Sequence, residues 1–265
     1  MLFRSLGGKN GLRTVEVDGA GQIIRDLEVP VNPVPGYNVE LTIDTRLQAA
    51  AKSAVKTELE GWNAWIGEER MTKAAVIAMN PKTGEILALV SYPTFENNRM
   101  ARQIPADYYQ QLVTDPDKPL FNYAISGEFP PGSVYKMAAA LGILNEDVVT
   151  PGQQVEDMGK ITILQKYSVN DIGTPREYVC WDEAGHGPVD YLHGIAWSCD
   201  VYWYKVGGGY GTEVPVGLGI WRMNEYAAAI GYGEPTGIEL PGEASGLLPD
   251  PTWKRTNLAE KWSKG

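Results

Sequence analysis

The stretch Phe129-Pro-Pro-Gly-Ser133-Val-Tyr-Lys136 decides what this chain folds into and what chemistry it can support. The prolines and the glycine stop any preceding element, and the residues after them predict a helix over about 133–144. Ser133 then lies in the first turn, near unpaired backbone N–H groups and the positive end of the helix dipole. Lys136 lies three residues later on the same face. A partly desolvated lysine can act as a base toward such a serine, so the stretch predicts serine acyl transfer.

A second Ser-x-x-Lys pair, Ser53-Ala-Val-Lys56, limits how much the bare pattern can carry. It lies inside an amphipathic helix predicted over 45–60, for which Asp44 is the expected N-cap. No helix end lies near Ser53 to activate its hydroxyl. We therefore interpret this pair as part of a solvated helix face.

The remaining pattern predicts an α+β fold, an antiparallel sheet with a helical lobe. Strands and helices are mixed without the regular alternation that a parallel sheet requires. The predicted elements are hairpins over 13–29 and 74–90, a short strand over 40–43, a proline-rich linker over 30–36, a partly β stretch up to about 188, and helices near 190–197 and 220–230.

Composition sets the broad class. The chain has 265 residues, of which 43% are hydrophobic and 21% charged, which are values of a globular domain with its own core. A net charge of −10 argues against nucleic acid as the main partner. No apolar run reaches the roughly 18 residues of a membrane span, and no signal peptide is visible. Both ends look cut, so we expect a fragment.

The serine motif and its surroundings resemble the transpeptidase domain of penicillin-binding proteins. Details point to the class B, elongation-type branch, penicillin-binding protein 2. The resemblance implies a penicillin-binding/β-lactamase-like transpeptidase fold that is incomplete at its C-terminus. It further implies that residues 1–36 are a remnant of the N-terminal pedestal module and linker, and that 37–265 is the transpeptidase domain. The stretches that carry the resemblance, besides the serine motif, are Asn122–Gly127, Glu40–Gln48, Met79–Ala88, Gly231–Leu240 and Pro249–Lys254.

The family's second motif, Ser-x-Asn, is matched by Ser198-Cys199-Asp200, with aspartate in the third place. The resemblance implies that Ser198 relays a proton between Lys136 and the leaving amine, and that Asp200 holds Lys136 by charge and hydrogen bond. A polar turn after a helix is the alternative. The aromatics that follow, Tyr202, Trp203 and Tyr204, are expected to pack the helical lobe, with a contact to carbohydrate or stem peptide as the alternative.

The third family motif, Lys-Thr-Gly, follows the second in family order. Its only literal copy here, Lys82-Thr83-Gly84, precedes Ser133 and lies in a predicted hairpin turn, so we reject it as catalytic. We expect the true motif to lie beyond Gly265, together with the strand that donates the second oxyanion-hole N–H. The fragment is then expected to be inactive or impaired.

A structural zinc site is the second chemical expectation. The resemblance places its ligands on Asp157, Cys180, His186 and Cys199, and two thiolates, an imidazole and a carboxylate suit tetrahedral zinc. Asp182 is the rival for the carboxylate position. A disulfide between the cysteines and a pair of reduced, buried thiols remain open as alternatives. His193 is interpreted as structural.

The function implied is that of a peptidoglycan D,D-transpeptidase in cell-wall synthesis, with Ser133 attacking D-Ala-D-Ala stem peptides and β-lactams, and with no cofactor for catalysis. The implied partners are the elongation glycan polymerase and other elongasome proteins, on the extracytoplasmic face of the bacterial membrane. Two alternatives remain. One is a binding scaffold without activity, and the other is a β-lactamase or β-lactam sensor of related fold.

Overall fold

The computed structural model describes residues 6–101, 103–165 and 172–257. The chain divides into two compact units, with unit 1 formed by 1–127 and 239–242, and unit 2 by 128–238 and 243–265. The predicted boundary after residue 36 refers to family modules rather than to compactness, and it stays a prediction. No helix in the described ranges is long and apolar enough to cross a membrane.

Unit 1 begins with the predicted hairpin, in which β1 (Val15–Val17) pairs antiparallel with β2 (Ile23–Asp26). One carboxylate oxygen of Asp18 accepts hydrogen bonds from two N–H groups of the connecting turn, which fixes the reversal. The side chains of β2 are all exposed, whereas Val15 and Glu16 of β1 are half-buried.

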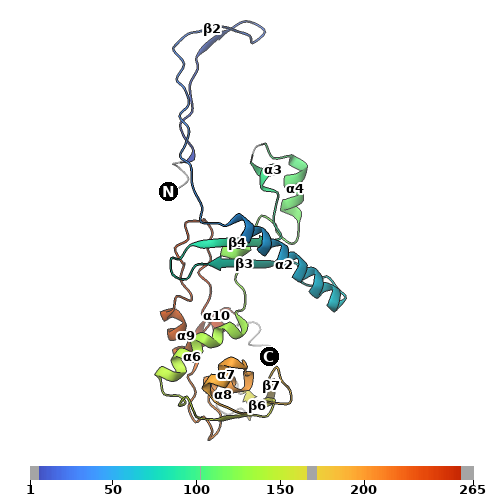
Figure 1. The fold of residues 1–265 in the computed structure, drawn as a ribbon, viewed down its shortest axis with the longest axis vertical. Helices are drawn as coiled ribbons and strands as arrows, with labels where there is room; N and C mark the ends of the chain where they lie inside the picture. Colours follow the sequence, from blue (N-terminus) through green and yellow to red (C-terminus); the bar gives the residue numbers. More distant parts are fainter. Residues whose placement is uncertain (1–5, 102, 166–171, 258–265) are drawn as a thin grey trace. The chain divides into compact units, whose positions relative to one another are not determined.

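The centre of unit 1 is helix α2 (Thr45–Ile66), which lies against a second antiparallel hairpin of β3 (Ala74–Met79) and β4 (Ile86–Tyr92) (Figure 1). The side-chain amide of Gln48 ties helix to strand, because it bonds both the N–H and the C=O of Leu89. The predicted strand over 40–43 is wrong. The segment forms no strand: the Thr42 hydroxyl bonds Ile86 O and the N–H of the following Asp44 bonds Leu87 O, which is not a strand ladder.

The helix caps follow the expected chemistry. Asp44 accepts from the N–H groups of Arg46 and Leu47, and Gly67 ends α2 in the left-handed conformation at φ 80°. Helix α2 ends at Ile66, six residues beyond the predicted end at residue 60. The described part of unit 1 also contains three short helices that we did not predict. They are α3 (Asn97–Met100), α4 (Ala106–Thr114) and α5 (Tyr123–Ser126).

Unit 2 carries the motifs. Among its described residues, a short 3₁₀ helix and five α-helices combine with two antiparallel strand pairs, β5 with β8 and β6 with β7. Figure 1 labels α6 to α10, β6 and β7. The elements are η1 (Gly132–Tyr135), α6 (Lys136–Asn145), β5 (Val155–Asp157), β6 (Lys160–Gln165), β7 (Thr174–Val179), β8 (Gly187–Val189), α7 (Tyr191–Ala196), α8 (Asp200–Gly208), α9 (Ile220–Ala229) and α10 (Pro251–Asn257).

The core of unit 2 forms around α6 and α8. Ile143 of α6 and Val201 and Val206 of α8 are fully buried in it. Tyr202 and Trp203 are buried as well, which confirms the predicted packing role for these two, whereas Tyr204 is partly exposed. Because α6 and α8 begin with Lys136 and Asp200, the same core that stabilises unit 2 also fixes the two sequence motifs relative to each other.

Candidate functional site

Ser133 lies at the start of the helical segment of unit 2, as the sequence predicted. The preceding Gly132 has φ 59°, a conformation that glycine adopts without strain, and this turns the chain into η1. The predicted helix over 133–144 is therefore 3₁₀ in its first turn and α from Lys136 to Asn145. Residues three apart eclipse each other in a 3₁₀ turn, so Ser133 and Lys136 share one side of it. Ser133 is exposed, and its Oγ makes no hydrogen bond within the described residues.

Lys136 is the centre of the polar contacts. Its Nζ lies 3.0 Å from Ser198 Oγ, 2.8 Å from Ser198 O and 2.6 Å from Asp200 Oδ1. Three oxygen atoms therefore surround the Lys136 nitrogen within hydrogen-bond distance. The side chains of Lys136 and Asp200 are 16% and 26% exposed, so this ion pair is shielded from water. The two motifs, which are 62 residues apart in the chain, thus meet at one nitrogen.

Ser198 occupies the turn between α7 and α8 in a strained conformation. Its φ is 52°, which a residue with a side chain adopts at a cost of roughly 1–2 kcal/mol. The N–H of Cys199 bonds back to Gly194 O, and Cys199 then caps α8 through its sulfur, which accepts from the N–H of Tyr202. The strain turns the carbonyl and the hydroxyl of Ser198 toward the same partner, Lys136.

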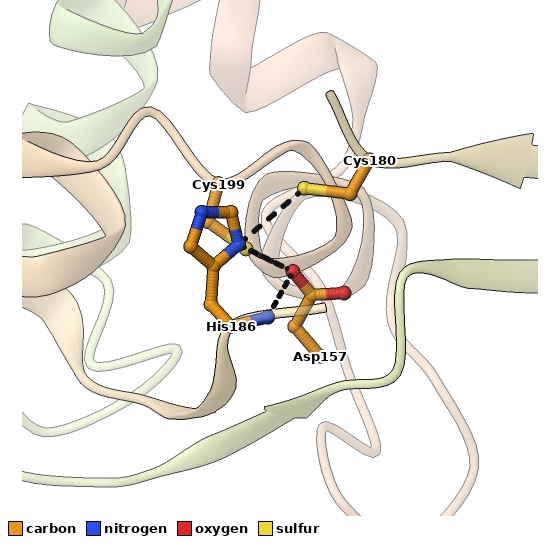
Figure 2. Close-up of side chains that lie close together, drawn as sticks. All are labelled: Asp157, Cys180, His186 and Cys199. Carbon is orange, nitrogen blue, oxygen red and sulfur yellow. Dashed lines mark hydrogen bonds and ion pairs between the residues drawn. The ribbon is translucent and has the colours of Figure 1, made fainter. Parts of the chain in front are cut away.

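The four predicted metal ligands converge in unit 2 (Figure 2). One ligand atom each from Asp157, Cys180, His186 and Cys199 lies within 4.8 Å of all the others. Asp157 Oδ2 is the common acceptor, at 2.7 Å from His186 Nδ1 and 3.1 Å from Cys199 Sγ. The two cysteines are both buried and do not form a disulfide. The geometry thus disfavours the disulfide alternative.

Glycines bring these ligands together. Gly159 and Gly185 both have positive φ, and a Cβ on Gly185 would come within 2.4 Å of the backbone oxygen of Asp157. A Cβ on Gly159 would likewise collide with the carbonyl of Glu183. The two turns can therefore lie against each other only without side chains at these positions. We did not use this signal, although Gly159 and Gly185 are visible in the sequence.

Electrostatics of the cluster favour a cation. Burial alone raises the pKa of Asp157, but hydrogen bonds from His186, Cys199 and the N–H of Gly159 outweigh burial and lower the pKa to about 2. Burial raises the pKa of the Cys199 thiol, with Asp157 adding to the rise. The carboxylate is thus held as an anion beside the Cys199 thiol, which stays protonated unless a cation draws its proton away. Two sulfurs, one imidazole nitrogen and one carboxylate oxygen are a donor set that fits tetrahedral zinc.

The rival ligand and the second histidine lie outside this cluster. The side chain of Asp182 stabilises its own turn, where Oδ1 accepts a hydrogen bond from the N–H of Ala184. His193 pairs through Nδ1 with Asp190 Oδ1 at 2.7 Å on helix α7. Among the residues that the structure describes, His193 thus bonds within its own helix turn, in keeping with a structural role.

The Lys82-Thr83-Gly84 copy lies in the exposed turn between β3 and β4. Asn80 organises this turn, because its carbonyl accepts from the N–H of Gly84. Local turn chemistry thus accounts for the three residues, as predicted. They belong to unit 1, whereas Ser133 belongs to unit 2.

One residue at the site was missed. Trp181 donates its main-chain N–H to Asp200 Oδ2 at 3.2 Å and its indole N–H to the carbonyl of Trp197 at 2.8 Å. Both partners are 16 or more residues away in the sequence. The only signal was its place directly after Cys180, and spacing alone does not reveal such contacts.

Comparison with known proteins shows which family contains these motifs. A family model described as the penicillin binding protein transpeptidase domain matches residues 74–261. The peptidoglycan D,D-transpeptidase MrdA of Acinetobacter baumannii is 33% identical over 260 residues, which are 98% of this chain and 34% of that protein. The MrdA protein of Escherichia coli K12 is likewise 33% identical, over 98% of this chain and 36% of its own length. The chain spans about a third of the length of these curated relatives.

Solved structures give the same answer. A chain from a peptidoglycan synthase complex, in a study of how polymerization and crosslinking are coordinated, matches with a TM-score of 0.75 and 31% identity. The match covers 99% of this chain and 44% of that one. Pseudomonas aeruginosa PBP2 in complex with WCK 5153 matches with a TM-score of 0.66 and 33% identity, over 86% of this chain and 43% of that one. These matches confirm the resemblance and the fold that the motifs predicted.

Proposed function

From the premise that the chain belongs to the penicillin-binding protein transpeptidase family, we propose that it supplies the nucleophile and proton relay of a peptidoglycan D,D-transpeptidase. The observation that carries the proposal is the convergence of Ser198 Oγ and Asp200 Oδ1 on Lys136 Nζ, next to the helix start that bears Ser133. A helix-start serine with a lysine three residues on, and a second hydroxyl on that lysine, is the equipment of serine acyl transfer.

Each residue has a role in this proposal. Ser133 Oγ attacks the carbonyl carbon of the penultimate D-Ala, and its proton passes to the unprotonated amine of Lys136. The proton moves on through Ser198 Oγ to the amine of the departing D-Ala, which leaves Ser133 as an ester. Asp200 holds the lysine nitrogen in reach of both hydroxyls.

The second half of the cycle reverses these proton transfers. An amine from a neighbouring stem peptide attacks the ester carbonyl, gives its proton to the Ser198–Lys136 pair and forms the new amide. The proton returns to Ser133 Oγ as the ester bond breaks. A β-lactam follows only the first half, because its ring amide opens and the acyl group stays on Ser133.

A structural zinc belongs to the same proposal. Asp157, Cys180, His186 and Cys199 would hold it, and when bound it supplies a cross-link rather than an acid or redox group. Support comes from the donor set and from the shared position of all four groups in the core of unit 2. Cys199 directly precedes Asp200, so the cluster and the proton relay share one turn. Unpaired buried thiols remain the alternative.

Partners and location follow from the substrate. Stem peptides with D-Ala-D-Ala ends lie outside the cytoplasmic membrane, so we place this domain on the extracytoplasmic face of the bacterial membrane. The match to a chain of a peptidoglycan synthase complex supports a glycan polymerase of the elongation machinery as partner. Within the full-length protein, residues 1–36 would complete the pedestal module.

The proposal is tested with the full-length protein and a synthetic stem peptide ending in D-Ala-D-Ala. We expect release of free D-Ala that penicillin blocks, and loss of this release in Ser133→Ala but not in Ser53→Ala. Absence of D-Ala release and of penicillin binding would favour the scaffold alternative. Sustained hydrolysis of nitrocefin would favour the β-lactamase alternative.

A further inference from the structure

Trp181 is large, apolar and exposed, yet it is anchored at two points. It follows β7, and 63% of its surface is exposed to solvent. Hydrophobic burial therefore contributes little to holding its side chain in place. Its two hydrogen bonds are directed at the residues immediately before and two places after Ser198. The proposed mechanism gives no role to this exposed tryptophan, which bonds residues before and after Ser198.

The indole of Trp181 closes the end of helix α7. Trp197 is the C-cap residue of α7, and the last carbonyls of a helix lack partners within it. Trp181 Nε1 donates to Trp197 O at 2.8 Å and so satisfies one of these groups. The ring also contacts His186 edge-on, with centroids 5.1 Å apart, and Trp197 stacks on the same imidazole with centroids 5.7 Å apart. One hydrogen bond and one ring contact thus orient the exposed indole.

The main chain of Trp181 fixes the carboxylate of Asp200. Its N–H lies 3.2 Å from Oδ2, while Oδ1 lies 2.6 Å from Lys136 Nζ. A carboxylate with one oxygen on a backbone donor and the other on an ammonium group cannot rotate without losing a bond. The direction of the ion pair to Lys136 is therefore set from the β7 side.

Between these two anchors lies the strained residue. Ser198 has φ 52°, and relaxation of its backbone would move both oxygens that contact Lys136. Residues held in such conformations persist only where their surroundings over-determine them. Lys136, at the start of α6, bonds the carbonyl of Ser198. Trp181, which follows β7, bonds the neighbouring residues Trp197 and Asp200.

We infer that Trp181 is a positioning residue: its two hydrogen bonds clamp the turn 197–200, that is, they hold it in one conformation and so keep Ser198 Oγ within hydrogen-bond distance of Lys136 Nζ. The inference rests on the proposed function for its catalytic consequence, but the clamp itself is a property of the turn. Loss of the indole N–H should let the turn relax, so that Ser198 Oγ leaves the lysine for part of the time.

The test removes the donor and keeps the ring, in the full-length protein. Trp181→Phe lacks the N–H, and replacement of Trp181 by β-(3-benzothienyl)alanine removes it with almost no change of shape. We expect the rate constant of acylation by a fluorescent penicillin to fall about 2- to 10-fold, the value of one net hydrogen bond, with the preceding dissociation constant unchanged. Replacement by 7-azatryptophan, which retains the N–H, should restore the rate. Trp65→Phe, at an exposed tryptophan of unit 1, is the matched control.

A second readout does not depend on acylation. Amide hydrogen exchange at residues 198–200 should accelerate in Trp181→Phe while the melting temperature stays within about 2 °C of the unaltered protein. Unchanged exchange at these amides together with an unchanged acylation rate would overturn the inference and leave the proposed function standing. If the unaltered protein is not acylated at all, the proposed function fails, and the exchange data alone decide whether the clamp exists.

Discussion

The two Ser-x-x-Lys pairs of this chain have the same spacing and opposite surroundings. In α2, Lys56 pairs with Glu60 at 3.7 Å, and both side chains are more than 60% exposed. In unit 2, Lys136 contacts Ser198 and Asp200, and its side chain is only 16% exposed. Ser53 lies in the middle of its helix, whereas Ser133 lies at the start of one. The difference teaches that the pattern gains chemical meaning from a helix start and from a second motif that reaches the lysine.

The largest expected effect is on the lysine itself. Lys136→Ala should lower the rate of penicillin acylation by about 10²–10⁴-fold, because it removes the base and proton relay. Lys56→Ala is the matched control and should leave the rate unchanged, since an exposed ion pair contributes little. Stopped-flow acylation of the full-length protein measures both. Equal effects of the two substitutions would remove the distinction between the pairs.

The second-largest difference is expected between the acidic residues that contact the two lysines, Asp200 for Lys136 and Glu60 for Lys56. Asp200→Ala should slow acylation by roughly 10- to 100-fold, as expected for the loss of a hydrogen bond to a charged group. Asp200→Asn retains an acceptor and should slow acylation less. Glu60→Ala, which removes the partner of Lys56, should have no effect. An Asp200→Ala variant with the unaltered acylation rate would show that Lys136 does not depend on this contact.

A smaller effect is expected from metal removal, and it should be confined to unit 2. A chelator at neutral pH should lower the melting temperature by about 5 °C or more, because each kcal/mol lost shifts it by roughly 2–4 °C in a chain of this size. Hydrogen exchange should rise around Cys180 and Cys199 and stay unchanged in α2 of unit 1. Metal analysis of the purified protein should find one zinc per chain. Chelation without any change in stability or exchange would leave the four groups as a metal-free cluster.

Local chemistry made much of the fold predictable. The hairpins over 13–29 and 74–90 follow from turn residues, and the start of α2 follows from the Asp44 cap and the apolar spacing after it. The end of α2 was placed too early, because Trp62 and Trp65 extend the helix without adding to its buried face, and only Gly67 stops it. The short helices α3, α4 and α5 lack long periodic patterns and were not predicted.

The residues of the candidate site could be chosen from the sequence, but the hydrogen bonds and backbone conformation that hold them in place could not. Ser133, Lys136, Ser198 and Asp200 were chosen from two motifs, and the contacts of Ser198 and Asp200 with Lys136 Nζ follow from the pairing of those motifs. The bond from the N–H of Trp181 to Asp200 belongs to backbone geometry, which no residue type encodes. The positive φ of Ser198 is equally hidden, because serine shows no preference for that conformation.

Peptide mapping after reaction with penicillin tests the central claim most directly. The full-length protein is incubated with benzylpenicillin, digested and analysed by tandem mass spectrometry, so that the acylated serine is read from fragment masses. The account predicts one penicilloyl group, on Ser133 within the peptide that also contains Lys136, and an unmodified Ser53. A penicilloyl group on any other serine, or an unmodified protein after prolonged reaction, would contradict it.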